Sequence, residues 1–336
     1  MKKKITDMKR VRRIRIAAAA VSFMLLVGMT VSCGKGKNGA IRVAALKGPT
    51  GIGMVRMMQQ DAEREAPHYA FTLSSAPEDV KAGLLSGEYD IASIPTNLAA
   101  LLYSKAGAKI SVLGINTLGV LYILENGDTV HSAADLAGKT LYATGQGSTP
   151  EYILRYILEK NGIDPTEDID IEYLTEHAEL ATRMSAGEIV LGMLPEPNVT
   201  SALLGAGDQP LRIALDLTAE WEKIAAGTTI TQGCIVVRRE FAEEHPEEVE
   251  AFIRDYEASA AFTASDPDPT AALCEEFGVI PKAALAKKAL PNCNVVFLTG
   301  AEMKTKLEAF LGVLFEADAS SIGGKLPDDA FYYGVK

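Results

Sequence analysis

The sequence predicts an α/β fold of about two domains. From residue 40 onward, short apolar runs alternate with stretches whose apolar residues recur at helical spacing, which is typical of a sheet covered by helices. The chain has 336 residues and 48% hydrophobic content, enough for more than one core. The apolar segment 110–124 is long for a single strand and suits a chain that passes between two domains.

The N-terminal region differs from the rest. Residues 1–32 contain eight Lys or Arg and one acid, and an apolar run from Ile16 to Val31 precedes Cys33. This resembles a bacterial lipoprotein signal peptide, although Thr30 stands where that pattern usually has Leu, and cleavage would leave Cys33 as the acylated first residue. Residues 33–39 look like a flexible tether. An ordinary cleaved signal or a single N-terminal anchor is the alternative, and each places the remaining chain outside the cytoplasm.

Charge and cysteine content exclude several functions. The net charge is −11, and because residues 1–32 carry +7, the remainder carries −18. Such an acidic surface argues against nucleic acid as a partner. Cys234, Cys274 and Cys293 have no metal-site or disulfide-framework spacing. A bridge between Cys274 and Cys293 and buried free thiols both stay open.

The first predicted units lie between residues 40 and 103. Residues 40–46 form a buried strand that breaks at a Gly-rich turn, 47–51, before a helix with Ile52, Val55, Met58 and Ala62 on one face. The methionines of this helix could line a pocket or belong to the core. A strand at 68–74, a helix at 77–86, a strand at 91–94 and a helix from residue 98 follow, with a Pro-Thr-Asn turn at 95–97.

The stretch 136–162 is a strand, a polar turn and a well-delimited helix. Residues 139–144 are the strand, Gly145 to Thr149 the turn, and Pro150 occupies the first helical position. Asn161 and Gly162 end the helix. Free N–H groups and the partial positive charge of a helix start suit an anion or an acceptor, so we expect the N–H groups of Gly147 to Thr149 to face a ligand. A capped helix without a ligand is the alternative.

A similar arrangement occurs twice. Residues 87–97, GEYDIASIPTN, and 187–198, GEIVLGMLPEPN, each place Gly-Glu before an apolar strand that ends in a Pro-containing polar turn. Glu196, between two prolines, is held either toward a cleft, where it would pair with an amine, or in solvent. Because ligands bind at the carboxyl ends of strands in open α/β sheets, these turns predict a binding site.

The remaining chain is predicted as strands at 169–174, 211–217 and 228–237, followed by a mostly helical region that includes 249–264 and 302–315. No nucleophile elbow, phosphate-binding glycine loop, dinucleotide motif or zinc-protease motif occurs, so no catalytic residue, cofactor or metal site is predicted. The four histidines are scattered among polar residues and are interpreted as solvated.

Three segments together resemble the substrate-binding proteins of ABC importers, in the group that includes the sulfonate, taurine, nitrate and thiamine-precursor binding proteins. They are DLAGKTLYATGQGSTPEYILRYILEKNGID, LPEP at 194–197, and VVRREFAEEHPEEVEAFIRDY at 236–256. The resemblance implies a two-lobed periplasmic binding protein-like fold (type II), with two crossings near 113–118 and 228–233 and a central cleft. Lobe one would comprise residues 40–115 plus 231–336, and lobe two residues 116–230.

The resemblance also implies a binding site and partners. The ligand-binding residues would be Lys47, Pro49, Thr50, Thr96, Asn97, Asn116, Thr117, Gln146, Gly147, Ser148, Thr149, Glu196, Asn198 and Gln232. A small solute such as a sulfonate, a pyrimidine or a zwitterion would be captured by hinge closure and delivered to ABC permease and ATPase subunits by a lipid-anchored, monomeric, non-enzymatic protein. Tyr122, Tyr152 and Trp221 could stack on a ring. An enzyme like the thiamine-pyrimidine synthase is the alternative.

Overall fold

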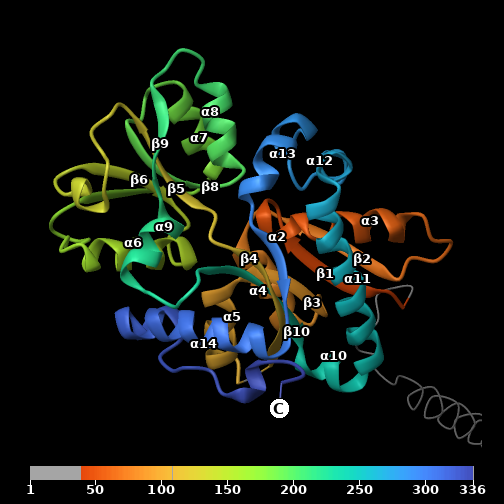
Figure 1. Ribbon diagram of the computed structural model, residues 1–336. Helices are drawn as coiled ribbons and strands as arrows, with labels where there is room; N and C mark the ends of the chain where they lie inside the picture. Colours follow the sequence, from red (N-terminus) through yellow and green to blue (C-terminus); the bar gives the residue numbers. More distant parts are fainter. Residues whose placement is uncertain (1–38, 108, 336) are drawn as a thin grey trace, which may run out of the picture. The chain divides into compact units, whose positions relative to one another are not determined.

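The computed structural model describes residues 39–107 and 109–335. The predicted signal peptide, the acylation site at Cys33 and the tether up to residue 38 lie outside the described residues. The described residues contain two separate sheets (Figure 1). Buried apolar clusters pack against both of them. None of the helices in this part of the chain has the length and apolar character needed to cross a membrane.

The first lobe is built on a six-stranded sheet in the order β11-β4-β10-β3-β1-β2. Strand β1 is parallel to its neighbours β2 and β3, whereas β10 is antiparallel to its neighbours β3 and β4. The strands are β1 (Ile41–Leu46), β2 (Tyr69–Ser74), β3 (Ile91–Pro95), β4 (Ile110–Leu118), β10 (Thr231–Arg238) and β11 (Val295–Leu298).

The helices that cover this sheet come from both ends of the described chain. They are α2 (Pro49–Ile52), α3 (Val55–Ala62), α4 (Pro77–Ser86), α5 (Thr96–Lys105), α10 (Arg239–Glu244), α11 (Pro246–Ser265), α12 (Pro267–Glu276), α13 (Ala283–Ala289) and α14 (Gly300–Ala317). Short 3-10 turns add η2 (Leu290–Asn292), η3 (Ala319–Ile322) and η4 (Asp329–Phe331).

The second lobe is built on a five-stranded sheet in the order β7-β6-β8-β5-β9. Strand β6 is parallel to β7 and β8, and β5 is antiparallel to β8 and β9. Its strands are β5 (Leu121–Asn126), β6 (Thr140–Thr144), β7 (Asp170–Leu174), β8 (Leu191–Pro195) and β9 (Leu211–Asp216). Its helices are η1 (Ala133–Leu136), α6 (Thr149–Lys160), α7 (His177–Ser185), α8 (Asn198–Gly205) and α9 (Leu217–Ile224).

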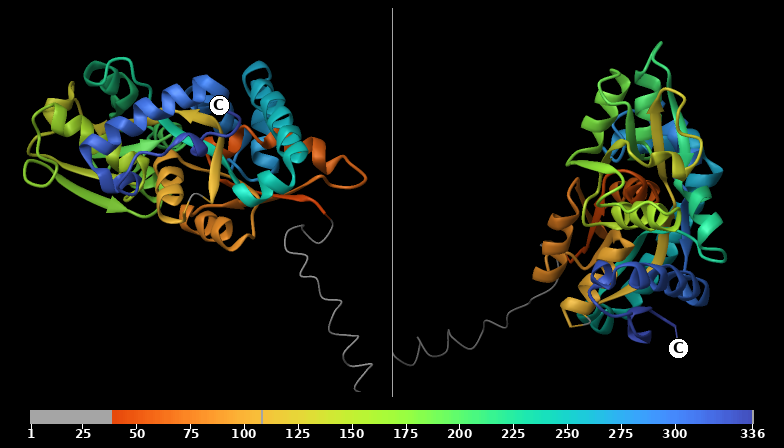
Figure 2. Two further views of the ribbon diagram at one scale, coloured as in Figure 1. Left: turned by 90° about the horizontal axis from the view of Figure 1, so that it is seen from below. Right: turned by 90° about the vertical axis from the view of Figure 1, so that its left-hand side faces the viewer.

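The chain passes from one sheet to the other at two places. The first passage is at Gly119 and Val120, directly after β4, and the second is the segment 225–230 between α9 and β10. Each follows or overlaps the crossing predicted from the sequence. In both views of Figure 2, the yellow-green elements of the second lobe and the orange and blue elements of the first lobe lie next to each other.

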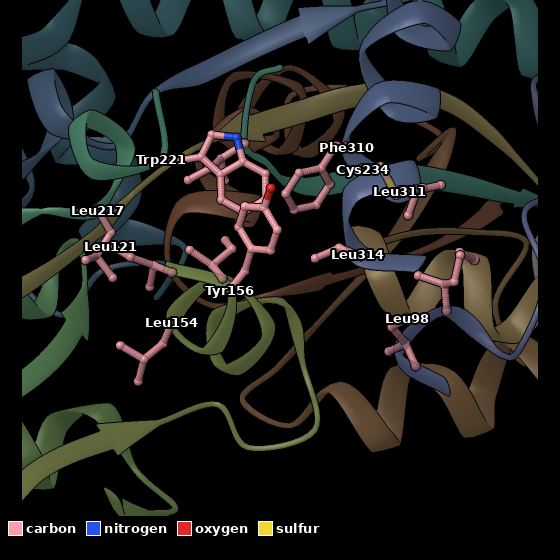
Figure 3. Packing of buried hydrophobic residues seen from close by; sticks show 14 of the residues in the cluster. Leu98, Leu121, Leu154, Tyr156, Leu217, Trp221, Cys234, Phe310, Leu311 and Leu314 are labelled. Carbon is pink, nitrogen blue, oxygen red and sulfur yellow. The ribbon is translucent and has the colours of Figure 1, made fainter. Parts of the chain in front are cut away.

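An aromatic cluster joins the two lobes beside these passages. The Trp221 ring of α9 lies 4.9 Å from the Tyr156 ring of α6 and 5.4 Å from the Phe310 ring of α14, measured between centroids (Figure 3). The indole N–H donates to the Thr228 hydroxyl at 2.8 Å. Trp221 is fully buried, so it belongs to the core and does not offer a face for stacking on a ligand.

Some local predictions differ from the structure. The helix expected over 52–62 is divided into α2 and α3. Gly53 lies between them, and a Cβ at this position would lie 2.2 Å from the Tyr256 hydroxyl, so the close approach to this ring requires glycine. The methionines of this region are core residues, each at most 4% exposed. Strand β11 lies in the region predicted as mostly helical, and it pairs with β4 at the edge of the first sheet.

Candidate functional site

Polar turns at the carboxyl ends of strands from both sheets meet between the lobes. Gly48 follows β1, and a Cβ built on it would lie 3.9 Å from the ring of Pro197, which follows β8 in the other lobe. Asn97 follows β3 and is hydrogen-bonded to Thr149, which follows β6. Two pairs of predicted site turns therefore face each other, as expected for open α/β sheets.

The contact between Asn97 and Thr149 joins the first turns of α5 and α6. The Thr149 hydroxyl donates to Asn97 Oδ1 at 2.9 Å and accepts the Asn97 backbone N–H at 3.5 Å. The Asn97 amide also donates to the carbonyl of Ser321 at 3.3 Å. Both side chains are buried, with 1% and 0% exposure. This contact holds the two lobes together in the conformation of the structure.

The turn that precedes α6 is more self-contained than predicted. The Gly147 N–H donates to the Glu151 carboxylate at 2.6 Å, and the Ser148 N–H donates to the carbonyl of Gly145 at 3.1 Å. The Ser148 hydroxyl donates to the same carbonyl at 2.8 Å. Neighbouring acceptors therefore already satisfy the N–H groups of Gly147 and Ser148 in this conformation, and a ligand at this turn would have to displace them. That these groups face a ligand in the cleft stays a prediction.

The same turn nevertheless borders a cavity between the lobes. Gln146, Gly147 and Ser148 line it from the second lobe, and Pro77, Glu78 and Leu98 line it from the first. Its volume is about 290 Å³. A space of this size lies at the lower end of the range for small-molecule sites.

Glu196 is buried at the lobe boundary. It is 1% exposed, and its carboxylate accepts the Thr200 N–H at 3.1 Å and the Thr200 hydroxyl at 2.9 Å. Asn292 of the first lobe donates to it at 3.4 Å. Burial raises the pKa of Glu196, and the hydrogen bonds partly offset this shift. The side chain therefore caps α8 and contacts the other lobe, and the interpretation as a solvated residue is wrong.

Asn116, Thr117 and Gln232 are buried in the first lobe. The Asn116 amide donates to the carbonyl of Thr50 at 3.0 Å and to the Ser93 hydroxyl at 2.7 Å, which ties α2 to the sheet. Gln232 is 9% exposed, and its Oε1 is buried without a hydrogen-bond partner. An unpaired buried acceptor is costly, so this oxygen is available to a ligand donor.

The other predicted site residues differ in their exposure to solvent. Lys47 is exposed, whereas Pro49, Thr50 and Asn198 are partly buried. Thr96 is fully buried, and its hydroxyl has no partner. The structure thus brings most of these residues to the lobe boundary, and their role in binding stays a prediction.

Three relevant side chains were missed. Glu151 follows Ser148 by three residues, and this Ser-x-x-Glu spacing of a capping box would have predicted a carboxylate over the start of α6. Asn292 lies in a short 3-10 turn that the sequence does not signal. His177 was interpreted as solvated, but it is partly buried and its Nδ1 lies 2.6 Å from the Thr144 hydroxyl.

The described residues hold no group of three or more His, Cys, Asp or Glu side chains that could hold a metal ion. Cys234, Cys274 and Cys293 are free thiols in buried positions. Burial raises the pKa of Cys234 and of Cys274 to about 12. Neutral thiols of this kind are poor nucleophiles.

In a comparison with known protein families, residues 57–275 match the family described as ABC transporter, phosphonate, periplasmic substrate-binding protein. The crystal structure of an ABC transporter from Parabacteroides distasonis is 26% identical, with a TM-score of 0.72, over 87% of this chain and 98% of that chain. No curated protein matches the sequence significantly.

Two further solved structures share the fold. The periplasmic aliphatic sulphonate binding protein SsuA from Escherichia coli is 19% identical, with a TM-score of 0.67, over 86% of this chain and 92% of that chain. The periplasmic nitrate-binding protein NrtA from Synechocystis PCC 6803 is 11% identical, with a TM-score of 0.61, over 86% and 85%. The predicted two-lobed α/β fold is confirmed.

Proposed function

The chain belongs to the family of periplasmic substrate-binding proteins of ABC transporters that includes the phosphonate-binding proteins, and from this premise we propose how it binds its solute. It is the substrate-binding component of an ABC importer for a small solute, which implies permease and ATPase partners. The comparisons lend no support to the enzyme alternative. Members of the family act outside the cytoplasm and are not enzymes, and we propose that this chain is not an enzyme either.

The solute occupies the space between the lobes, and its binding favours the closed arrangement. The observation that carries this proposal is the bond between Asn97 and Thr149, which links the carboxyl edge of one sheet to that of the other. A solute that contacts both edges only when they are close shifts the equilibrium toward closure. Lobe one would comprise residues 40–115 and 231–336, and lobe two residues 116–230, except that residues 116–118 are the end of β4 and continue the first sheet.

The predicted ligand-binding residues divide between the lobes. The turn at Lys47 to Thr50, Thr96, Asn97 and the buried polar residues Asn116, Thr117 and Gln232 would supply the first lobe's contacts. Gln146 to Thr149, Glu196 and Asn198 would supply those of the second lobe. Support comes from the cavity bordered by Gln146 to Ser148 and from the unpartnered Oε1 of Gln232.

The protein acts as a lipid-anchored monomer with Cys33 as its first residue after removal of residues 1–32. The basic start, apolar run and following cysteine support this assignment. Labelling with a radioactive or clickable palmitate should modify the wild-type protein and not the Cys33→Ser variant. Equal labelling of both would reject the anchor without affecting the binding function.

Native mass spectrometry of the purified protein, followed by a thermal-shift screen of small solutes, tests the function itself. A bound solute at 100 times its dissociation constant adds about 2.7 kcal/mol to stability. Trp221 is the single tryptophan of the chain and contacts both lobes, so its fluorescence should change on binding. Chemical turnover of the bound solute would contradict the proposal.

A further inference from the structure

A carboxylate without a cationic partner is buried where the lobes meet. Glu196 receives its hydrogen bonds from an uncharged backbone group, a hydroxyl and an amide. Within the described residues it forms no ion pair, and no positive charge offsets its burial. Buried carboxylates in folded proteins are usually paired with a cation, since desolvation of the charge costs several kcal/mol.

Two carboxylates, Glu196 and Asp216, act on the Tyr122 hydroxyl. In the strand order β8-β5-β9, Tyr122 of β5 pairs with Leu194 of β8 on one side and with Asp216 of β9 on the other. Burial, together with the charges of Asp216 and Glu196, raises the pKa of Tyr122 to about 12, and no described positive charge acts against this shift. The Tyr122 ring therefore lies in a negative corner of the lobe boundary.

The start of α6, where an oxyanion would be expected, already holds a carboxylate. Glu151 accepts the Gly147 N–H through one oxygen and the Arg155 guanidinium, at 2.8 Å, through the other. A phosphonate or sulfonate at this turn would have to displace that carboxylate or lie against it. The Arg155 guanidinium offsets part of the Glu151 charge, so the main obstacle to an oxyanion is that Glu151 already occupies the Gly147 N–H.

Among the unpaired buried groups of the described residues, Gln232 offers an acceptor, whereas the hydroxyls of Thr96 and Thr231 can donate or accept. The Oε1 of Gln232 is an acceptor that lacks a donor, and Gln232 directly precedes Gly233, which pairs with Pro95 at the start of α5. Its side chain is nine-tenths buried, and its backbone lies beside the start of α5, the helix that carries Asn97. Acceptors require a ligand that donates, and an oxyanion offers none.

We propose that the solute is a small organic amine or an aminated heterocycle whose N–H groups bind Glu196, and that an oxyanion is not the group selected. This inference rests on the proposed function. A protonated amine would neutralise Glu196 and place its positive charge beside the Tyr122 ring and Asp216. The cleft would then differ in selectivity from those of the sulphonate- and nitrate-binding proteins that share its fold.

The protein is first unfolded, dialysed and refolded to remove any bound solute. It is then mixed with equimolar pairs of probes, in which the two members of each pair differ by one amino group. Suitable pairs are taurine with ethanesulfonate, 4-aminobutyrate with butyrate, and 4-amino-2-methylpyrimidine with 2-methylpyrimidine, with putrescine as a pure amine. Bound masses are read by native mass spectrometry and affinities by calorimetry. The protein should retain members that carry an amine and bind each at least ten times more tightly than its partner.

The Glu196→Gln variant keeps the shape and the cap of α8 but removes the charge. It should lose roughly ten- to a hundredfold in affinity for the charged-amine probes, the range expected for one charge-assisted hydrogen bond. Glu220→Gln is the matched control, since Glu220 is also a buried acid of the second lobe but pairs with Lys223 on α9. Circular dichroism checks that both variants fold.

The outcomes separate the two proposals. Retention of ethanesulfonate or butyrate as tightly as their aminated partners overturns the amine assignment and leaves the binding function standing. Unchanged selectivity in Glu196→Gln also overturns it, since Glu196 would then be only the cap of α8. Failure to retain any probe overturns the amine assignment for these compounds, and failure to bind any solute from a cell extract as well rejects the proposed function.

Discussion

The hydroxyl of Thr149 should control closure of the lobes. Thr149→Val preserves the shape of the side chain and removes only this hydroxyl, which donates to Asn97 Oδ1 at 2.9 Å. Asn97 is 1% exposed, so its amide oxygen would lose its donor in the closed form and regain water in the open form. A net cost of about 1 to 1.5 kcal/mol to closure follows.

This cost converts directly into affinity. If the solute binds tightly only to the closed form, a reduced closed population weakens apparent binding by about five- to tenfold. The assay is a titration of the co-purified solute, followed by the fluorescence of Trp221. Thr144→Val is the matched control, because Thr144 is also buried but its hydroxyl contacts His177 within the second lobe.

Three outcomes refute the reasoning. The first is that Thr149→Val binds the solute as tightly as the wild type. The second is that Thr144→Val weakens binding as much as Thr149→Val does. The third is that Thr149→Val weakens binding in an Asn97→Ala background by the same factor as in the wild type. The last result would show that the two side chains do not act through their mutual hydrogen bond.

Further predictions concern stability and reactivity. Gly53→Ala should destabilise the fold by about 1 to 3 kcal/mol in urea unfolding, since its Cβ would lie 2.2 Å from the Tyr256 hydroxyl. Tyr256→Phe should restore part of this loss, because the ring carbon that carried the hydroxyl would still lie 2.8 Å from the new Cβ. No rescue would place the strain elsewhere. Burial lowers the pKa of His177 from 6.5 to about 4. Stability is therefore complete above pH 6.5 and should fall by up to about 3 kcal/mol as the pH drops to 4, a fall that His177→Asn should abolish. The three buried thiols should resist a thiol reagent at pH 8 until the protein is unfolded, and rapid labelling of the native state would contradict their burial.

Sequence patterns predicted those strands that are apolar and end at a glycine or proline turn. Alternation of apolar runs with glycine turns located β1, β3, β6 and β8, and the long apolar segment at 110–124 indicated the passage between sheets. Strand β11 escaped because four residues at a sheet edge are too few for periodicity to reveal. The need for glycine at residue 53 depends on Tyr256, about two hundred residues away in the chain, and local patterns do not reveal such a contact.

Sequence patterns indicated where the candidate site lies better than they indicated which polar groups are already paired there. The polar turns were found because strand ends and helix starts carry local signals, and Glu196 stood out between two prolines. The hydrogen bond from the Gly147 N–H to Glu151 was not predicted, although the Ser-x-x-Glu spacing of a capping box is present in the sequence. The burial of Trp221 and the contact of Asn292 with Glu196 could not be predicted, because both depend on how distant segments pack across the lobes.

A crystal structure of the protein with a bound solute would show both the position and the chemistry of the ligand. We expect density for a small solute between the two sheets, in contact with at least one turn from each lobe and with an amino nitrogen within hydrogen-bond distance of Glu196. A solute bound outside the lobe boundary would contradict the site. A solute at the boundary with an oxyanion against Glu151 and no contact to Glu196 would contradict the ligand class.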